Sequence, residues 1–152
     1  MNVLQRIGPA AASRTAVTPL DVAGPATEGE AARLRRLFRR WVGAVADEDT
    51  ADDLTLAVYE ALANAVDHAY HRAAGPGPMR LWAAVSVPLH GGRDLVVTVA
   101  DDGLWRDSTD AGWRGRGLPM VRSLCTSASV FTTPSGTTVQ MRRRVDSAAV
   151  PA

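Results

Sequence analysis

The chain of 152 residues is 46% hydrophobic with a formal net charge of +1, which fits one compact domain with a normal core. Two domains would each be too small to bury their own surface well, and the near-neutral charge gives no indication of a nucleic acid partner. All 17 basic residues are arginines, so a P-loop lysine is excluded and any charged side chain that contacts phosphate must be an arginine.

The cysteine content and the hydropathy exclude several further classes. A single cysteine, Cys125, excludes an internal disulfide, and one cysteine with three histidines shows no metal-ligand spacing. We interpret Cys125 as a small buried apolar residue. No window reaches the roughly 18 continuous apolar residues that span a bilayer, and the N-terminus lacks the charged and apolar runs of a signal peptide. A cytoplasmic protein without a membrane partner is therefore expected.

The N-terminal part of the chain predicts a flexible end, a strand and a helix. Residues 1–14 are rich in Ala, Ser and Pro and are expected to be frayed. Residues 15–22 predict a short edge strand, which Pro19 weakens because proline donates no backbone hydrogen bond. From 28 to about 46, apolar residues recur at spacings of three and four, which predicts an amphipathic helix capped by Thr27.

A second helix is expected after the acidic stretch 47–49, which ends the first helix. Thr50 and Asp53 resemble a capping box for its start, and the helical pattern reaches about Tyr70 or Arg72. A Gly-Pro-Gly-Pro sequence at 75–78 then breaks the pattern. The expected buried stripe of this helix consists of Leu54, Val58, Ala61, Leu62, Ala65 and Ala69.

The remainder of the chain predicts two antiparallel hairpins and a short helix between them. The expected strands are 79–88, 94–100, 128–133 and 137–145, with the helix at 118–125. Helices and antiparallel strands thus segregate, which predicts one α+β domain over 15–145, built as a two-layer sandwich. Residues 146–152 are expected to form a second flexible end.

Three polar side chains of the second predicted helix, Glu60, Asn64 and His68, lie at i, i+4 and i+8, so they are expected to stack along one strip. Asn64 stands among small apolar residues, where a buried polar group needs partners. A carboxylate and an amide oxygen one turn apart can serve Mg²⁺ and a water or hydroxyl nucleophile, because magnesium prefers oxygen ligands and substrate phosphates. Taken alone, the strip is better explained by a solvated polar face.

Two glycine-containing segments follow that helix. Asp101 ends a buried strand two residues before Gly103, and its carboxylate suits the exocyclic amine of adenine, although a plain Asp-Gly turn also fits. Residues 114–118, Arg-Gly-Arg-Gly-Leu, open the short helix and could present backbone N–H groups, the helix dipole and two guanidinium groups to an anion. A flexible linker is the alternative there, and residues 135–138, Ser-Gly-Thr-Thr, predict a hairpin turn.

The order of these motifs resembles the GHKL ATPase superfamily: an Asn/Glu helix, Asp-x-Gly after a strand, Gly-x-Gly opening a helix, and Gly-Thr before a last strand. Within it, residues 56–70 look like the N box of the small RsbW-type anti-sigma factor kinases, and residues 114–118 and 136–137 look like their later boxes. The resemblance covers about residues 28–145. It implies the Bergerat fold, an α+β two-layer sandwich with a mixed, mostly antiparallel sheet.

The resemblance also implies a role for each matching residue. Asn64 would ligate Mg²⁺, and Glu60 would act as a base toward a protein hydroxyl. Asp101 would accept from the adenine amino group, Gly103 would allow close approach, and Thr137 would support the adenine end. The nucleotide-binding set is completed by Arg114, Gly115, Arg116, Gly117 and Leu118, of which the two glycines would contact phosphates.

The implied cofactors are ATP and Mg²⁺, and the implied activity is that of a serine/threonine protein kinase. Its substrate would be an anti-anti-sigma factor, and the unoccupied kinase would sequester a sigma factor. Family members are commonly dimers, which favours a homodimer. One departure is Trp105, which stands where the superfamily often has a further glycine; another is the short lid from Arg106 to Arg114.

The sequence leaves three alternatives to the kinase. An ATP-binding interaction module without phosphotransfer is the main alternative, since Glu60 and Asn64 favour a kinase without proving it. A histidine kinase fragment is disfavoured because no histidine precedes Glu28. DNA binding by the arginine-rich first helix is disfavoured because acidic residues follow directly, so its arginines form a solvated face or a surface for the sigma factor.

Overall fold

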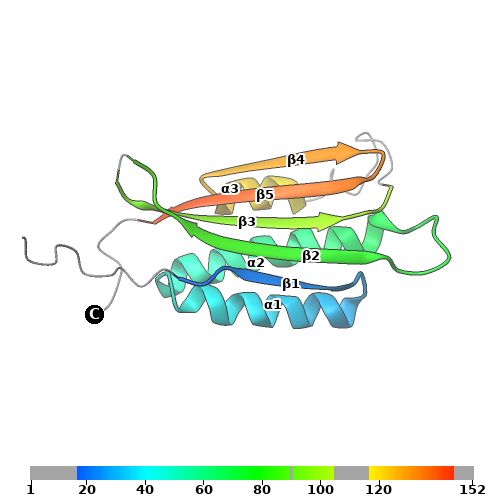
Figure 1. Ribbon diagram of the computed structural model, residues 1–152, viewed down its shortest axis with the longest axis horizontal. Coiled ribbons are helices and arrows are strands. Elements are labelled where there is room, and N and C mark those ends of the chain that lie inside the picture. The colour runs from blue at the N-terminus through cyan, green and yellow to red at the C-terminus, as the bar shows by residue number, and fades with distance from the viewer. Residues whose placement is uncertain (1–16, 90, 105–116, 146–152) are drawn as a thin grey trace, which may run out of the picture.

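A five-stranded sheet lies against the helices in the computed structural model, which describes residues 17–89, 91–104 and 117–145 (Figure 1). The strands lie in the order β1 (Leu20–Pro25), β2 (Pro78–Ser86), β3 (Arg93–Asp101), β5 (Gly136–Val145) and β4 (Ser127–Thr133). Each of the four pairings is antiparallel, where a mixed, mostly antiparallel sheet was expected. The predicted α+β two-layer architecture is confirmed, and the expected flexible ends at 1–14 and 146–152 lie outside the described residues.

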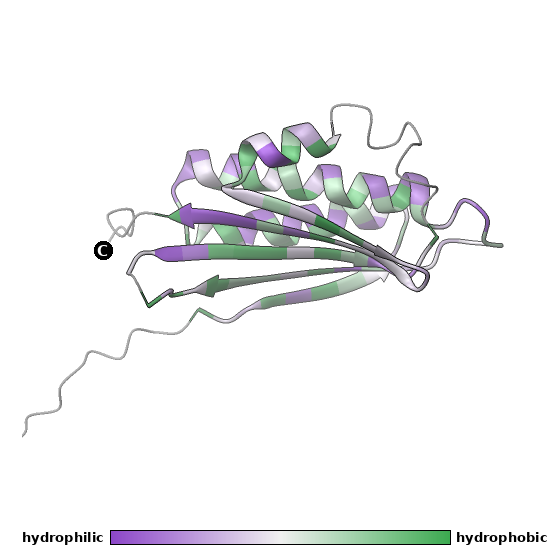
Figure 2. Cartoon of the chain, turned by 90° about the horizontal axis from the view of Figure 1, so that it is seen from above, coloured by the Kyte–Doolittle hydropathy of each residue, from purple (hydrophilic) through white to green (hydrophobic). Residues whose placement is uncertain are grey.

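The helices gather on one face of this sheet, as Figure 2 shows from above. Helices α1 (Glu28–Gly43) and α2 (Glu48–Asn64) pack side by side, and α3 (Gly117–Leu124) packs against α2. The alternation of apolar residues along the strands places one face of the sheet under these helices, which is the pattern of a half-buried antiparallel sheet. The largest buried side chains of this single core include Leu34, Phe38, Leu54, Leu62, Leu81, Val97 and Met141.

The ends of the elements are set by specific residues. Thr27 caps α1 as predicted, because its Oγ1 accepts from the Glu30 backbone N–H at 3.3 Å. The predicted capping box of Thr50 and Asp53 is wrong. Asp47 is the N-cap of α2, and its two carboxylate oxygens accept from the backbone N–H and the hydroxyl of Thr50 at 2.8 and 2.9 Å. Thr50 is therefore the donor at the third helical position, and α2 begins one turn earlier than expected.

Two further boundaries differ from the predicted ones. Strand β1 starts at Leu20, directly after Pro19, because a proline nitrogen cannot join the ladder to β2. Helix α2 does not continue as a regular helix to Tyr70, since residues Ala65–Ala69 at its C-terminal end form a π-helix. Such π-helical turns frequently occur at functional sites.

Candidate functional site

The C-terminal end of α2 meets the first residue of α3. A Cβ atom placed on Gly117 would lie 3.3 Å from Asn64 Nδ2 and 3.7 Å from Glu60 Oε2. The structure thus brings Glu60, Asn64 and Gly117 together, from segments more than fifty residues apart. The positive end of the α3 dipole lies at this point, where backbone N–H groups of the first turn have no partner within the helix.

Asn64 is buried without a complete set of hydrogen bonds. The residue is 8% exposed, and its side-chain amide nitrogen has no hydrogen-bond partner among the described residues. A buried amide donor without a partner costs about 1–3 kcal/mol, so native proteins rarely retain one without a reason. The expected strip of Glu60, Asn64 and His68 is not a regular one, because the π-helix begins between Asn64 and His68.

Two more buried polar residues lie at the end of the sheet near Asn64. Asp101 and Thr137 are partners across β3 and β5, and they are 6% and 1% exposed. In strand alternation both belong to the set with Val99 and Val139, which faces the helices. The Asp101 Oδ1 atom accepts from the Gly103 backbone N–H at 3.0 Å, whereas the Thr137 hydroxyl has no hydrogen-bond partner within the residues described.

Two glycines allow backbone segments at this end of the sheet to pack closely against each other. A Cβ atom on Gly103 would lie 2.0 Å from the carbonyl oxygen of Ala69, so the Asp-x-Gly turn packs directly on the π-helix. The close approach predicted for Gly103 is therefore seen toward the protein's own backbone. Gly136 has φ of 151°, and a Cβ there would lie 2.1 Å from the Asp101 carbonyl oxygen. Only glycine fits at Gly136, a constraint that the predicted hairpin turn does not reveal.

Tyr70 is a residue of this region that the sequence analysis did not single out. Its hydroxyl accepts from the Asp102 backbone N–H at 2.9 Å and donates to the Pro78 carbonyl oxygen. Partial burial, aided by the nearby carboxylates of Asp101 and Asp102, raises the pKa of Tyr70, although the bond from Asp102 opposes this. The phenol is therefore held in its protonated form, which can both donate and accept. An aromatic hydroxyl at the end of a helical motif is the only sequence signal that could have pointed to it.

Of the remaining residues named from the sequence, the structure describes Leu118 and Cys125. Leu118 lies in the first turn of α3 and is partly buried. Arg114, Gly115, Arg116 and Trp105 lie outside the described residues. Cys125 is partly buried, and burial raises the pKa of its thiol to about 11, which agrees with an unreactive apolar role.

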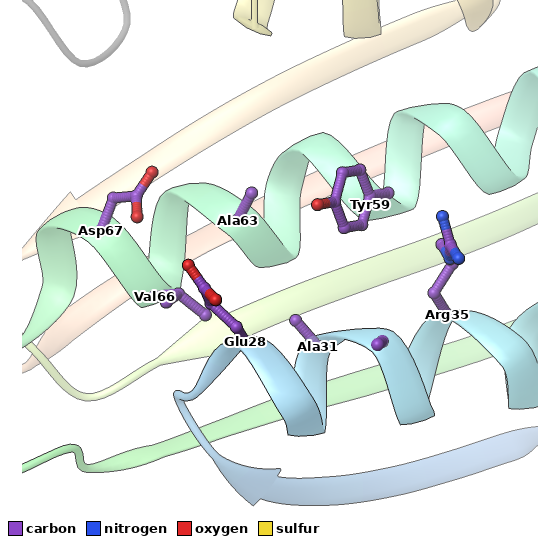
Figure 3. Close-up of a pocket in the computed structure, with 8 residues that line it drawn as sticks. Glu28, Ala31, Arg35, Tyr59, Ala63, Val66 and Asp67 are labelled. Atoms are coloured by element: carbon purple, nitrogen blue, oxygen red, sulfur yellow. The ribbon is translucent and has the colours of Figure 1, made fainter.

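A groove of about 310 Å³ lies between α1 and α2 on another face of α2 (Figure 3). Arg35 places its guanidinium 5.1 Å from the centre of the Tyr59 ring at one part of this groove. The groove is lined by Glu28, Ala31, Ala32, Arg35, Tyr59, Ala63, Val66 and Asp67. None of these is a predicted site residue, so the groove shares no lining residue with the end that carries Asn64, Asp101 and Thr137.

The composition of the described part of the chain limits which ligands it could hold. It contains no group of three or more His, Cys, Asp or Glu residues that could hold a metal ion. A cation at Glu60 and Asn64 would thus need oxygen ligands from a bound substrate or from water. Among the described helices, none is long and apolar enough to cross a membrane.

Comparison with known proteins identifies a family for this chain. Residues 24–143 match the histidine kinase-like ATPase domain family. The crystal structure of the RsbU and RsbW domains of Rv1364c from Mycobacterium tuberculosis is similar, with 26% identity and a TM-score of 0.67 over 87% of this chain. This chain covers only 34% of that structure's length.

Two further solved structures show more distant similarity. The SiaB–SiaC complex from Pseudomonas aeruginosa gives 16% identity and a TM-score of 0.46, over 83% of this chain and 89% of that chain. The histidine kinase domain of the Erythrobacter litoralis EL346 blue-light activated histidine kinase gives 25% identity and a TM-score of 0.46, over 78% and 64%. On the family match, this chain belongs to the histidine kinase-like ATPase domain family, and within it resembles the RsbW-type anti-sigma factor kinases.

Proposed function

We propose that this chain binds Mg·ATP at the end of the sandwich that carries Asn64, Asp101, Thr137 and Gly117, and transfers phosphate to a serine or threonine of an anti-anti-sigma factor. The observation that supports this most is the pair of buried polar atoms without partners in the described residues, Asn64 Nδ2 and Thr137 Oγ1. Burial of unpaired polar atoms is unfavourable in the free protein. A polar ligand that supplies hydrogen-bond partners for these two atoms would remove this unfavourable term.

The adenine end of the ligand fits the sheet side of the site. The Asp101 carboxylate would accept from the exocyclic amine of adenine, and the adjacent Thr137 hydroxyl would bond a ring nitrogen, directly or through water. Both groups are almost fully buried, so each hydrogen bond is made with little competition from solvent. Gly103 and Gly136 let the surrounding backbone close without a side chain in the way.

The phosphate end fits the helical side of the site. The backbone N–H groups at Gly117 and Leu118, together with the helix dipole of α3, favour phosphate oxygens at that position. Arg114, Gly115 and Arg116 precede them in sequence and are proposed to extend the phosphate contacts. The Asn64 side-chain oxygen would ligate Mg²⁺, and bound Mg²⁺ would neutralise charge on the phosphates.

Glu60 is proposed as the base. Glu60 lies one helical turn before Asn64, and its Oε2 lies close to Gly117. It therefore faces the space in which the phosphates would bind. There it can take the proton of the serine or threonine hydroxyl as that oxygen bonds to the γ-phosphorus of ATP, while the bond from that phosphorus to the bridging oxygen breaks and ADP leaves. We further propose that the unoccupied kinase sequesters a sigma factor, that the chain acts as a homodimer, and that it works in the cytoplasm.

The test is incubation with labelled ATP, Mg²⁺ and the cognate anti-anti-sigma protein, comparing the wild type with Glu60→Gln and Asn64→Ala. Glu60→Gln is expected to bind ATP but to lose about 100-fold or more in transfer rate, since a positioned base contributes at least that much. Asn64→Ala is expected to weaken Mg·ATP binding itself. Glu48→Gln, an exposed carboxylate at the first turn of α2, is the matched control and should change neither.

Each result separates the kinase from the alternative. Transfer by the wild type that Glu60→Gln abolishes supports the kinase. Calorimetric binding of ATP without transfer would leave an ATP-binding interaction module. No binding of ATP by the wild type would remove both.

A further inference from the structure

A tyrosine hydroxyl is inserted at the point where β2 and β3 stop pairing. Met79 and Asp101 form the last pair of their ladder, and the next register position sets Pro78 opposite Asp102. The Tyr70 hydroxyl bridges these two residues, accepting from the Asp102 backbone N–H at 2.9 Å and donating to the Pro78 carbonyl oxygen. The chain after Asp101 therefore leaves the sheet at a position defined by one side chain.

The ring of Tyr70 is itself held in place. A Cβ atom on Gly77 would lie 2.3 Å from Tyr70 Cε1, so the ring lies directly on the Gly77 backbone. The neighbouring Ala69 carbonyl oxygen accepts from the Leu104 N–H at 2.9 Å, and Gly103 packs on Ala69. The turn after β3 is thus attached at Asp102 and at Leu104 to two successive residues at the end of the helix.

This attachment controls the direction of a carboxylate. Asp101 Oδ1 accepts from the Gly103 N–H inside the same turn, so the Asp101 side chain follows the position of the backbone that Tyr70 holds. We infer that Tyr70 is a positioning residue for adenine recognition: by fixing the turn from Asp101 to Gly103, it aims the Asp101 carboxylate at the exocyclic amine of the base. This inference rests on the ATP site proposed above.

The consequence is a change in selectivity and not only in affinity. Tyr70→Phe keeps the ring on Gly77 but removes the hydroxyl from between Asp102 and Pro78. The probes are ATP and purine riboside 5′-triphosphate, which lacks the amine that Asp101 would read. The wild type should bind ATP about tenfold more tightly, the value of roughly one good hydrogen bond to a charged group. In Tyr70→Phe this ratio should fall toward one, while the affinity for the second probe changes little.

A second perturbation reaches the same residue from the other side. Gly77→Ala places a methyl group where the Tyr70 ring now lies, so the ring must move although its hydroxyl is kept. The same loss of selectivity is expected. Gly75→Ala is the matched control, because a Cβ there meets nothing within 4 Å. Tyr59→Phe is the control for removing a phenol hydroxyl from the exposed face of α2.

The calorimetric titrations have distinct outcomes. A ratio that falls in both Tyr70→Phe and Gly77→Ala, and not in Gly75→Ala or Tyr59→Phe, supports the inference, and Gly77→Ala alone decides if Tyr70→Phe does not fold. Equal weakening of both nucleotides would show a merely structural role and overturn it. A wild type that binds both nucleotides equally would also overturn it, yet leave the ATP site standing. A wild type that binds neither would remove the proposed function and this inference together.

Discussion

The two ends of the sheet treat their buried polar groups in opposite ways. At one end, here called the closed end, Asp94 pairs with Arg142 at 3.0 Å and Thr50 bonds Asp47. Arg143 also joins this end, bonding the Leu124 carbonyl oxygen at 2.6 Å. At the other, here called the ligand end, Asn64 Nδ2 and Thr137 Oγ1 lack hydrogen-bond partners in the described ranges.

This difference indicates that the two ends of the sheet have different roles, one in stability and the other in the proposed binding of ATP. The closed end stabilises the fold, because its buried polar residues Thr50 and Asp94 each have a hydrogen-bond partner inside the protein. The ligand end retains polar groups whose desolvation is unfavourable, and under the proposed function bound ATP would offset that cost. Substitutions at the two ends should therefore have opposite effects on stability and on binding.

The largest expected effect is at the closed end. Arg142→Met would leave the Asp94 side chain, 9% exposed, without the partner that is itself 48% exposed. We expect a loss of about 1–3 kcal/mol in the free energy of unfolding, because a largely buried carboxylate loses its counter-ion. Urea denaturation measures it, and the affinity for ATP should be unchanged. Adding Asp94→Asn should recover most of the loss; a variant pair that recovers nothing would contradict the assignment.

A matched pair of threonines compares the two ends directly. Thr50→Val removes a hydroxyl that bonds the Asp47 carboxylate and should cost about 1–2 kcal/mol. Thr137 is 1% exposed, and its hydroxyl is unpaired among the described residues, so Thr137→Val should leave stability equal or raise it by up to about 1 kcal/mol. The same substitution should weaken ATP binding about tenfold. Two destabilisations of equal size would remove the distinction between the ends.

The acid stability of the closed end depends on its helix cap. Hydrogen bonds from the Thr50 backbone and hydroxyl lower the pKa of Asp47 below its usual range. A lowered folded-state pKa adds stability that is present above the unfolded pKa and lost as pH falls through the folded one. Comparison with Asp47→Asn, which caps but does not titrate, from about pH 6 to about pH 2 should show the wild-type advantage disappearing on acidification. An advantage that is independent of pH would contradict this.

The smallest expected effect is on the surface between α1 and α2. Arg39 and Asp52 form an ion pair at 2.9 Å, but their side chains are 38% and 64% exposed. Arg39→Gln should change the free energy of unfolding by less than about 0.5 kcal/mol, and salt should reduce even that. A loss as large as that of Arg142→Met would mean that burial does not decide the value of these pairs.

The sequence predicted the architecture because its signals are periodic or chemical. The apolar stripes predicted both long helices, and the resemblance to the GHKL superfamily implied that Glu60, Asn64 and the Gly-x-Gly segment belong to one site. The structure places Gly117 beside the two side chains accordingly. The capping box failed at Thr50 because Asp47, Thr50 and Asp53 are spaced three apart, and the pattern alone did not select the first of them as cap.

Other features have no local signature. The π-helix at Ala65–Ala69 occurs in residues of ordinary helix propensity, so no sequence window distinguishes it from a regular turn. The contacts of Tyr70 with Asp102 and Pro78 depend on the arrangement of three segments in space. Gly136 looks like an ordinary hairpin glycine, and only its distance to the Asp101 carbonyl oxygen shows the constraint.

The position of β1 in the sheet has a consequence for how the chain folds. β2 with β3 and β4 with β5 are joined by short connections, so these hairpins can close locally. Leu20 of β1, in contrast, pairs with Ala83 of β2, and both long helices lie between them in the chain. Closing so long a loop is entropically unfavourable and slows folding. During synthesis β1 leaves the ribosome before its partner strand exists, and it must wait, unpaired, until α1, α2 and β2 have followed.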